Sequence, residues 1–294
     1  MTEPFAETET QRTKSKWMAQ VFKGFGRPRT TIRALFYHAL QRKESDYPIC
    51  GYFVGEIRVT RPYHESDGER LLKWATKARE LGYVPGDAFL EEVPGEHLYL
   101  ADAASWARPF CLELWLSRSA FDPLLLPVCS NLGVTLVSVS GGPPSRQFTD
   151  ALCVRAEGKP TIVLCLSDLR ADSFTFCRDL GKAIAMTQIR EDLDIRLRHV
   201  ALTPEQGVEM NIPMVPDVAA KKMQQRLFQK YLKPYRLNSR RMAELDALEA
   251  YYPGGLAGFV KEALSRYASG PDLEGEHWVL DLKKGIIPED VDMR

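Results

Sequence analysis

The chain has 294 residues, of which 45% are hydrophobic and 27% are charged, and its 39 basic and 39 acidic side chains balance. This is the composition of a globular protein with room for two domains. The six cysteines lie in apolar segments without CxxC or Cys/His spacing, which argues against a zinc site and is typical of a reducing compartment. The sequence shows neither a charged-then-apolar leader nor an apolar run of membrane-span length, so we expect a cytoplasmic protein without a membrane partner.

The charge is distributed unevenly along the chain. Nearly every charged side chain from Arg12 to Lys43 is basic, all of them are basic from Lys221 to Arg241, and the tail after Asp272 is rich in acids. Two basic stretches on a neutral protein favour a localised phosphate-binding surface. A solvated helix face is the alternative interpretation of the same pattern.

The N-terminal part reads as a small helical domain. Residues 1–15 lack apolar periodicity and are predicted to be a disordered arm, whereas residues 32–40 have the spacing of an amphipathic helix. A short strand or wing over residues 51–59 and a second helix over residues 69–81 follow, and this helix carries Lys73, Lys77 and Arg79 on its exposed side. We interpret residues 16–104 as a DNA-binding domain. A helical cap with a solvated basic face fits the periodicity equally well.

Strands and helices alternate after Phe110. This order predicts an α/β domain over residues 105–270, with a parallel sheet covered by helices on both faces. Sites in such sheets lie at the carboxyl ends of the strands, which directs attention to Glu113 and Asp168. Residues 271–294 form an acidic tail that either docks on the body or a partner or adds a strand at the edge of the sheet.

Seven short segments carry a resemblance to a known family. In the larger domain they are ELWLSRSA (113–120), SGGPPS (140–145), VLCLSD (163–168), RHVALTPEQ (198–206) and AELDAL (243–248), and before it they are TIRALFYHAL (31–40) and KARELGYVP (77–85). The five later blocks resemble the Toprim domain of the topoisomerase VI A-subunit family, which includes the meiotic double-strand-break protein. The earlier two resemble the winged helix of small bacterial, plasmid and phage relatives. The resemblance therefore implies a winged-helix domain followed by a Toprim-like parallel-sheet domain.

The resemblance implies a specific chemistry. Family enzymes cleave DNA by attack of a winged-helix tyrosine on a phosphodiester, while Toprim carboxylates hold Mg²⁺ against the phosphate. Tyr37 matches the tyrosine position, and a helical wheel predicts that it lies off the apolar face beside Arg33, where both could reach one phosphate. A partly buried tyrosine that packs against the wing is the alternative for this residue.

The expected metal site departs from the family pattern. The positions at which the family has carboxylates read Ser117-Arg118 and Asp168-Leu169-Arg170. Magnesium prefers several oxygen ligands, which leaves Glu113, Asp168 and Asp172 as candidate metal ligands, while Glu244 and Asp246 could also approach. Arg170 is expected to pair with Asp168 and to substitute a fixed positive charge for the metal.

Two functions of different classes follow. The first is a catalytically silent relative that binds DNA or a partner protein, and its expected DNA contacts are Arg33, Lys73, Lys77, Arg79, Arg118 and Arg170. The alternative is an active Mg²⁺-dependent, type IIB topoisomerase-like DNA-cleaving enzyme with Tyr37 and Arg33 as catalytic residues. A Toprim-type hydrolase that uses a metal-activated water is less favoured, because it needs the missing carboxylates. The family implies a homodimer, and the lack of a GxxxxGK[ST] loop means that ATP-driven strand passage would require a separate ATPase subunit.

Overall fold

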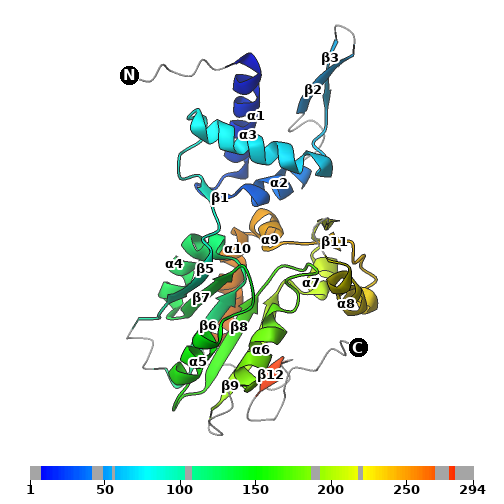
Figure 1. Ribbon diagram of the computed structural model, residues 1–294. Helices are drawn as coiled ribbons and strands as arrows, with labels where there is room; N and C mark the ends of the chain where they lie inside the picture. The colour runs from blue at the N-terminus through cyan, green and yellow to red at the C-terminus, as the bar shows by residue number, and fades with distance from the viewer. Residues whose placement is uncertain are drawn as a thin grey trace. The chain divides into compact units, whose positions relative to one another are not determined.

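The chain folds into two compact units, each described here by itself. The computed structural model describes residues 8–41, 49–54, 57–102, 108–186, 193–217, 221–268 and 278–281 (Figure 1). Unit 1 comprises Met1–Glu91 with Glu249–Tyr251, and unit 2 comprises Glu92–Leu248 with Tyr252–Arg294. The described residues contain ten α-helices and a mostly parallel sheet of six strands, so the predicted α/β class is confirmed.

Unit 1 consists of three helices, an antiparallel hairpin and a short parallel strand pair. The helices are α1 (Glu9–Phe25), α2 (Ile32–Gln41) and α3 (Gly68–Glu80), and the hairpin is formed by β2 (Ile49–Val54) and β3 (Ile57–Arg61). The strand pair is formed by β1 (Thr30–Thr31) and β4 (Phe89–Leu90). The helices predicted over residues 32–40 and 69–81 and the strand predicted after residue 50 are therefore present.

The prediction of a disordered arm over residues 1–15 is wrong for residues 9–15, which form the first turns of α1. Thr8 caps this helix, because its side chain accepts a hydrogen bond from the backbone N–H of Gln11 while the Gln11 side chain accepts one from Thr8. Trp17, Met18 and Val21 are buried, so the helix contributes to the core of unit 1. Residues 1–7 lie outside the described part.

The sheet of unit 2 has the strand order β12-β9-β8-β6-β7-β5. The four inner strands are parallel, and the two edge strands run antiparallel to their neighbours. This arrangement confirms a mostly parallel sheet, and its strands β6, β7 and β8 are almost completely buried on both faces. The strands are β5 (Gly95–Tyr99), β6 (Cys111–Leu116), β7 (Thr135–Ser140), β8 (Thr161–Leu166), β9 (Ile195–Ala201) and β12 (Leu280–Asp281).

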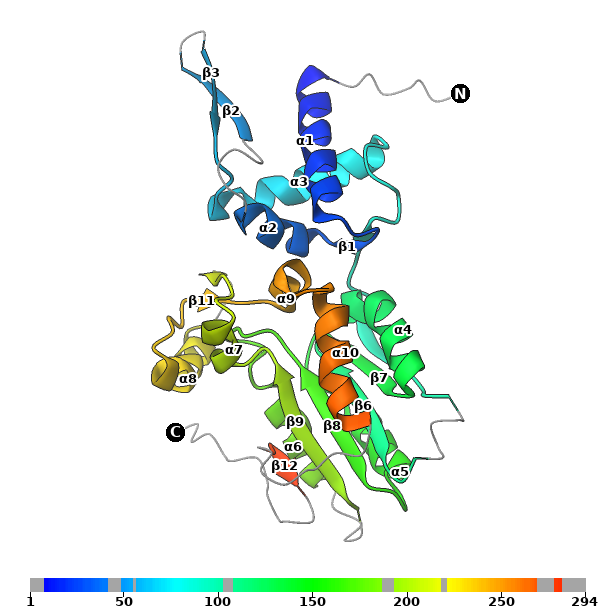
Figure 2. The ribbon, with the colours of Figure 1, turned by 180° about the vertical axis from the view of Figure 1, so that it is seen from behind.

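Helices cover both faces of this sheet (Figures 1 and 2). One face packs against α5 (Arg146–Arg155) and α6 (Phe176–Met186), and its core includes Trp115, Val163 and Leu152. The other face carries α4 (Asp122–Leu132) and α10 (Gly255–Ala268). The remaining elements are α7 (Pro204–Glu209), α8 (Lys222–Leu232), α9 (Leu245–Tyr251), the strand pair β10 (Val215–Pro216) and β11 (Arg241–Met242), and 3-10 turns at Glu65–Asp67, Ser119–Phe121 and Lys233–Tyr235.

One boundary differs from the sequence prediction, and one alternative for the C-terminal tail is resolved. The division between the units falls after Glu91 rather than at residue 104, because β5 is an edge strand of the large sheet. Within the predicted acidic tail, Leu280 and Asp281 pair with β9, so the edge-strand interpretation holds for those residues.

Two further findings concern helices and cysteines. In the part of the chain that the structure describes, no helix combines the length and the apolar character that a membrane span requires. Four of the five cysteines described there are buried, and all five are free thiols.

The core of unit 2 gives a direct stability prediction on one helix. Leu152→Ala removes a completely buried side chain from α5 and should reduce the free energy of unfolding by about 2–5 kcal/mol. Val154, on the same helix, is 61% exposed, so Val154→Ala should change this free energy by less than about 0.5 kcal/mol. Chemical denaturation measures both values. Equal losses in the two variants would contradict the described packing of α5.

Candidate functional site

The candidate site lies where the parallel strands β6 and β8 end. Arg118 follows β6 by two residues and Asp168 follows β8 by two residues, and the strands are direct neighbours. The segment before α9 is joined to this edge, because Leu169 and Ala243 form an antiparallel bridge. The backbone N–H of Leu245 also donates to Oδ1 of Asp168 at 2.8 Å. The fold thereby brings Glu244 and Asp246 to the carboxyl ends of the strands.

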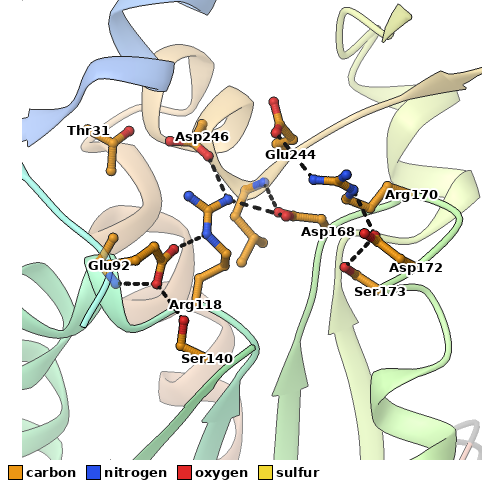
Figure 3. A network of polar contacts seen from close by, with 12 residues as sticks. Thr31, Glu92, Arg118, Ser140, Asp168, Arg170, Asp172, Ser173, Glu244 and Asp246 are labelled. Carbon is orange, nitrogen blue, oxygen red and sulfur yellow. Dashed lines mark hydrogen bonds and ion pairs between the residues drawn. The ribbon is translucent and has the colours of Figure 1, made fainter. Parts of the chain in front are cut away.

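The guanidinium of Arg118 lies among three carboxylates (Figure 3). Its Nη1 is 3.3 Å from Oδ2 of Asp168 and 3.2 Å from Oδ2 of Asp246, and its Nε donates to Glu92. The exposed fractions of the Asp168 and Asp246 side chains are 3% and 0%. We call Arg118, Glu92, Asp168 and Asp246 the Arg118 cluster.

Glu92 is fixed by short polar contacts in addition to its ion pair. Its Oε2 accepts hydrogen bonds from the Ser119 hydroxyl at 2.9 Å, from the Ala120 backbone N–H at 3.2 Å and from the Ser140 hydroxyl at 3.1 Å. These donors come from the turn after β6 and from the end of β7. Glu92 therefore connects the segment before β5 to the same strand ends.

The charges of the cluster depend on one another. Burial by itself would raise the pKa of Glu92, but Arg118 together with the hydrogen bonds from Ser119 and Ala120 holds the pKa below its usual value. Burial raises the pKa of Asp168 even though Arg118 opposes the shift. Burial would lower the pKa of Arg118, yet Asp246 and Asp168 raise it well above its usual value, so the guanidinium stays charged.

A second arginine occupies a neighbouring acidic group. The Nε of Arg170 is 2.8 Å from Oδ1 of Asp172, while its other nitrogens lie 3.9 Å from Asp217 and 4.0 Å from Glu244. The sequence prediction that Arg170 pairs with Asp168 is corrected, because Arg118 forms the ion pair with Asp168. The reason is geometric: Asp172 and Glu244 flank Arg170, as Figure 3 shows.

Glu113 is not part of this site. Its Oε1 accepts from Nε of Arg155 at 2.7 Å, and its Oε2 accepts from Nη2 of Arg155 at 3.0 Å and from the Trp115 indole N–H at 2.8 Å. It lies in the first half of β6, opposite Thr135 and Val163, so it does not reach the carboxyl end of the strand. The structure therefore does not bring Glu113 together with Asp168 and Asp172.

The three predicted metal ligands are held apart by three different arginines. Glu113 pairs with Arg155, Asp168 with Arg118 and Asp172 with Arg170. Magnesium would require several oxygens directed at one point. Among the residues that the structure describes, no group of three or more His, Cys, Asp or Glu side chains is placed to hold a metal ion. The three predicted ligands are therefore not directed at one point in this arrangement.

The predicted nucleophile lies in unit 1, where its environment differs from the expectation. The Arg33 guanidinium carbon is 5.4 Å from the centre of the Tyr37 ring, so the predicted proximity of the two is confirmed. However, Tyr37 is 0% exposed, and the prediction that it lies off the apolar face of α2 is wrong. The helix is buried on several sides, because Phe36 is also covered and lies 6.0 Å from the ring of Tyr63.

Two of the three basic side chains on the predicted basic face of α3 form ion pairs with glutamates. Lys73 is exposed, whereas Lys77 Nζ lies 2.9 Å from Glu80 and Arg79 Nη1 lies 2.6 Å from Glu91. Two of the three predicted DNA contacts on this helix are therefore engaged within unit 1. Such exposed pairs exchange readily with solvent and contribute little to stability.

Two acidic residues near the strand ends had no signal in the sequence. Glu92 lies 26 residues before Arg118 in the chain. Asp217 follows β10, is 5% exposed, and neither of its carboxylate oxygens has a hydrogen-bond partner among the described residues. Only the folded arrangement brings these two residues close to the ends of β6 and β8.

Comparisons with known proteins give no assignment for this site. The sequence matches no protein-family model and no curated protein. The function must therefore be inferred from the residues and their contacts.

The Arg118 cluster predicts a pH-dependent stability defect. Arg118→Ala leaves Asp168 and Asp246 buried without their cation and should cost about 3–5 kcal/mol of unfolding free energy near pH 7. Without Arg118 the folded-state pKa of Asp168 rises further above its ordinary value of 3.8. Between the two pKa values the folded chain keeps Asp168 protonated while the unfolded chain releases the proton, so the folded state loses stability as the pH rises. The loss should therefore grow as the pH rises from below this value towards 7.

Denaturation curves at several pH values measure this difference between the variant and the wild type. Arg146, whose side chain is 80% exposed and pairs with Asp150 at 3.6 Å, provides the control, and Arg146→Ala should cost less than about 1 kcal/mol at every pH. Combining Arg118→Met with Asp168→Asn and Asp246→Asn should recover much of the loss. A pH-independent defect in Arg118→Ala would show that the acids do not depend on this arginine.

Proposed function

We propose that this chain binds double-stranded DNA and is a catalytically silent relative of the topoisomerase VI A-subunit family. In this proposal unit 1 is the winged-helix domain and unit 2 is the Toprim-like domain. The observation that carries the proposal is the position of Arg118, whose guanidinium lies within 3.3 Å of both Asp168 and Asp246. A fixed cation thus stands between carboxylates that a Toprim enzyme would direct at magnesium.

A fixed guanidinium differs from a metal ion in what it can do. It neutralises buried carboxylates and donates hydrogen bonds, but it has no open coordination position and does not activate a water molecule. Asp172 and Glu113 are also engaged by arginines, so the chain's own contacts do not supply a replacement ligand set. These contacts favour a scaffold role over metal-dependent cleavage.

The burial of Tyr37 supports the same conclusion. A nucleophile must bring its oxygen to about 3–3.5 Å from phosphorus, in line with the leaving group. Tyr37 is completely covered and packs against Arg33 and Phe36. Its hydroxyl is therefore not presented to a phosphodiester in this conformation.

The surface around α8 supports DNA as the partner. Between residues 221 and 240 the sequence contains no acidic residue, and its seven exposed cations are Lys221, Lys222, Arg226, Lys230, Lys233, Arg236 and Arg240. Such a surface attracts a polyphosphate and releases counterions on binding. Arg118 and Arg170 are each flanked by several carboxylates, so we assign the main phosphate contacts to α8 and the turn after it.

The proposal predicts binding without cleavage. Wild-type protein should retain its retardation of duplex DNA in a gel when EDTA replaces Mg²⁺, because Arg118 rather than a metal neutralises the acids. Supercoiled plasmid incubated with Mg²⁺ and quenched with detergent and protease should stay intact, for wild type and for Tyr37→Phe alike. Nicked or linear plasmid and a covalent adduct that disappear in Tyr37→Phe would instead identify an active cleaving enzyme.

The contribution of α8 to duplex binding can be separated from general charge effects. Removing one cation that binds a phosphate should reduce the slope of log K against log salt by about 0.9. The double variant Lys222→Gln/Arg226→Gln should therefore show a shallower slope, whereas Arg146→Gln/Lys261→Gln, which removes two exposed cations from other helices, should not. Identical slopes for both double variants would place the DNA contacts elsewhere.

A further inference from the structure

A large cavity in unit 2 lies along the strand β9, away from the Arg118 cluster. Its volume is about 1210 Å³, and residues of α6, β9, α7, α8 and α10 line it together with Trp278 and Val279. These elements can be followed in Figure 2. β12 pairs with β9 only at Arg196 and Leu197, so the cavity adjoins the part of β9 that follows this pairing. A space of this size exceeds what a drug-sized ligand needs.

Aromatic side chains from three helices and their flanking segments line the cavity. The rings of Phe174 and Tyr231 are stacked, with centroids 5.2 Å apart and an angle of 27° between their planes. On α10, Phe259 meets Tyr252 edge to face at a centroid distance of 5.3 Å. All four side chains are partly exposed, so they can offer ring surface to a ligand. Partly exposed aromatic rings are the surfaces on which nucleic-acid bases stack.

Basic side chains stand beside these rings. Arg198 on β9 donates to the phenol oxygen of Tyr267 at 2.8 Å, and Lys230 on α8 is exposed. The Nε of Arg178 is buried and has no hydrogen-bond acceptor among the described residues. A buried donor without an acceptor is costly, and an anionic ligand would satisfy it.

The acids in the cavity wall are already engaged. Glu205 accepts a hydrogen bond from Tyr235, and Glu262 accepts one from Tyr252 at 2.5 Å and one from Arg266 at 2.9 Å. Four basic side chains, those of Arg178, Arg198, Lys230 and Arg266, line the cavity with these two carboxylates, and Nη2 of Arg178 also lies 3.5 Å from Asp179. The cavity combines stacking surface with an excess of positive charge.

We infer that this cavity binds a nucleotide, with the base stacked on the Phe174–Tyr231 pair and the phosphate held by Arg178. The nucleotide is either a free mononucleotide or an unpaired nucleotide at the end of a DNA strand, since both present the same base and phosphate. The inference goes beyond duplex binding and does not depend on it. His199 lines the cavity and lies 3.0 Å from the hydroxyl of Ser167, the residue before Asp168, so the nucleotide would sit one strand away from the Arg118 cluster.

Isothermal titration calorimetry of the full chain tests this inference. The probes are AMP and ATP for the free nucleotide, 5′-phosphorylated oligothymidylate for a strand end, and adenosine and inorganic phosphate for the two halves of the ligand. We expect at least one nucleotide probe to bind more tightly than adenosine or phosphate. Binding of the mononucleotides indicates the first source, and binding of the oligonucleotide alone indicates the second.

Two variants separate stacking from charge. Tyr231→Leu keeps an apolar side chain but removes the ring and should weaken nucleotide binding at least about fivefold, as expected when a base loses its stacking partner. Arg178→Gln should weaken nucleotides more than adenosine. Arg146→Gln, on α5 and outside the cavity, should have no effect. Unchanged thermal unfolding shows that each variant is folded.

Either of two results would overturn the inference. The first is that no nucleotide or oligonucleotide binds to folded wild-type protein at millimolar probe concentration. The second is that the probes bind to Tyr231→Leu and to Arg178→Gln as tightly as they bind to the wild type. The proposed duplex binding would survive both results, because the exposed surface of α8 carries it and neither variant alters that charge pattern.

Discussion

The ion pairs of Arg118 are the interactions on which the candidate site depends. Glu92, Asp168 and Asp246 come from segments far apart in the chain, and the guanidinium contacts a carboxylate of each. Two of these carboxylates are almost completely buried, and an unpaired buried charge costs several kcal/mol. One arginine therefore holds the segment before β5, the loop after β8 and the start of α9 together at the carboxyl ends of β6 and β8.

An arginine in this position also limits what the site can do. A metal ion can leave, bind substrate oxygen or activate water, whereas a guanidinium on a short loop stays in place and only donates hydrogen bonds. The acids around Arg118 and Arg170 outnumber the two arginines, so this edge of the sheet is unfavourable for phosphates. In the proposed function the basic surface of α8 supplies the attraction for DNA instead, so the stabilising acid cluster and the proposed nucleic-acid surface are separate.

Sequence reasoning predicted the strand and helix order because apolar runs and turn residues report local structure directly. It failed where the outcome depended on partners from distant segments. The helical spacing predicts that Tyr37 lies off the apolar face, but α2 is covered on several sides. The strand pattern directs attention to Glu113 as a metal ligand, yet Arg155 of α5 lies 42 residues away in the chain and binds it. The partners of Arg118 lie up to 128 residues away, so no local pattern could identify them.

The central claim is that Arg118 takes the place of a metal ion, and Mn²⁺ binding tests it most directly. Electron paramagnetic resonance measures free Mn²⁺ as the ion is titrated into wild-type protein and into Asp168→Asn. If the account is correct, both proteins leave the same amount of Mn²⁺ free, because the carboxylates already bind a guanidinium. Stoichiometric Mn²⁺ binding by the wild type that is lost in Asp168→Asn would contradict it, because the ion would then have displaced Arg118 from the acids.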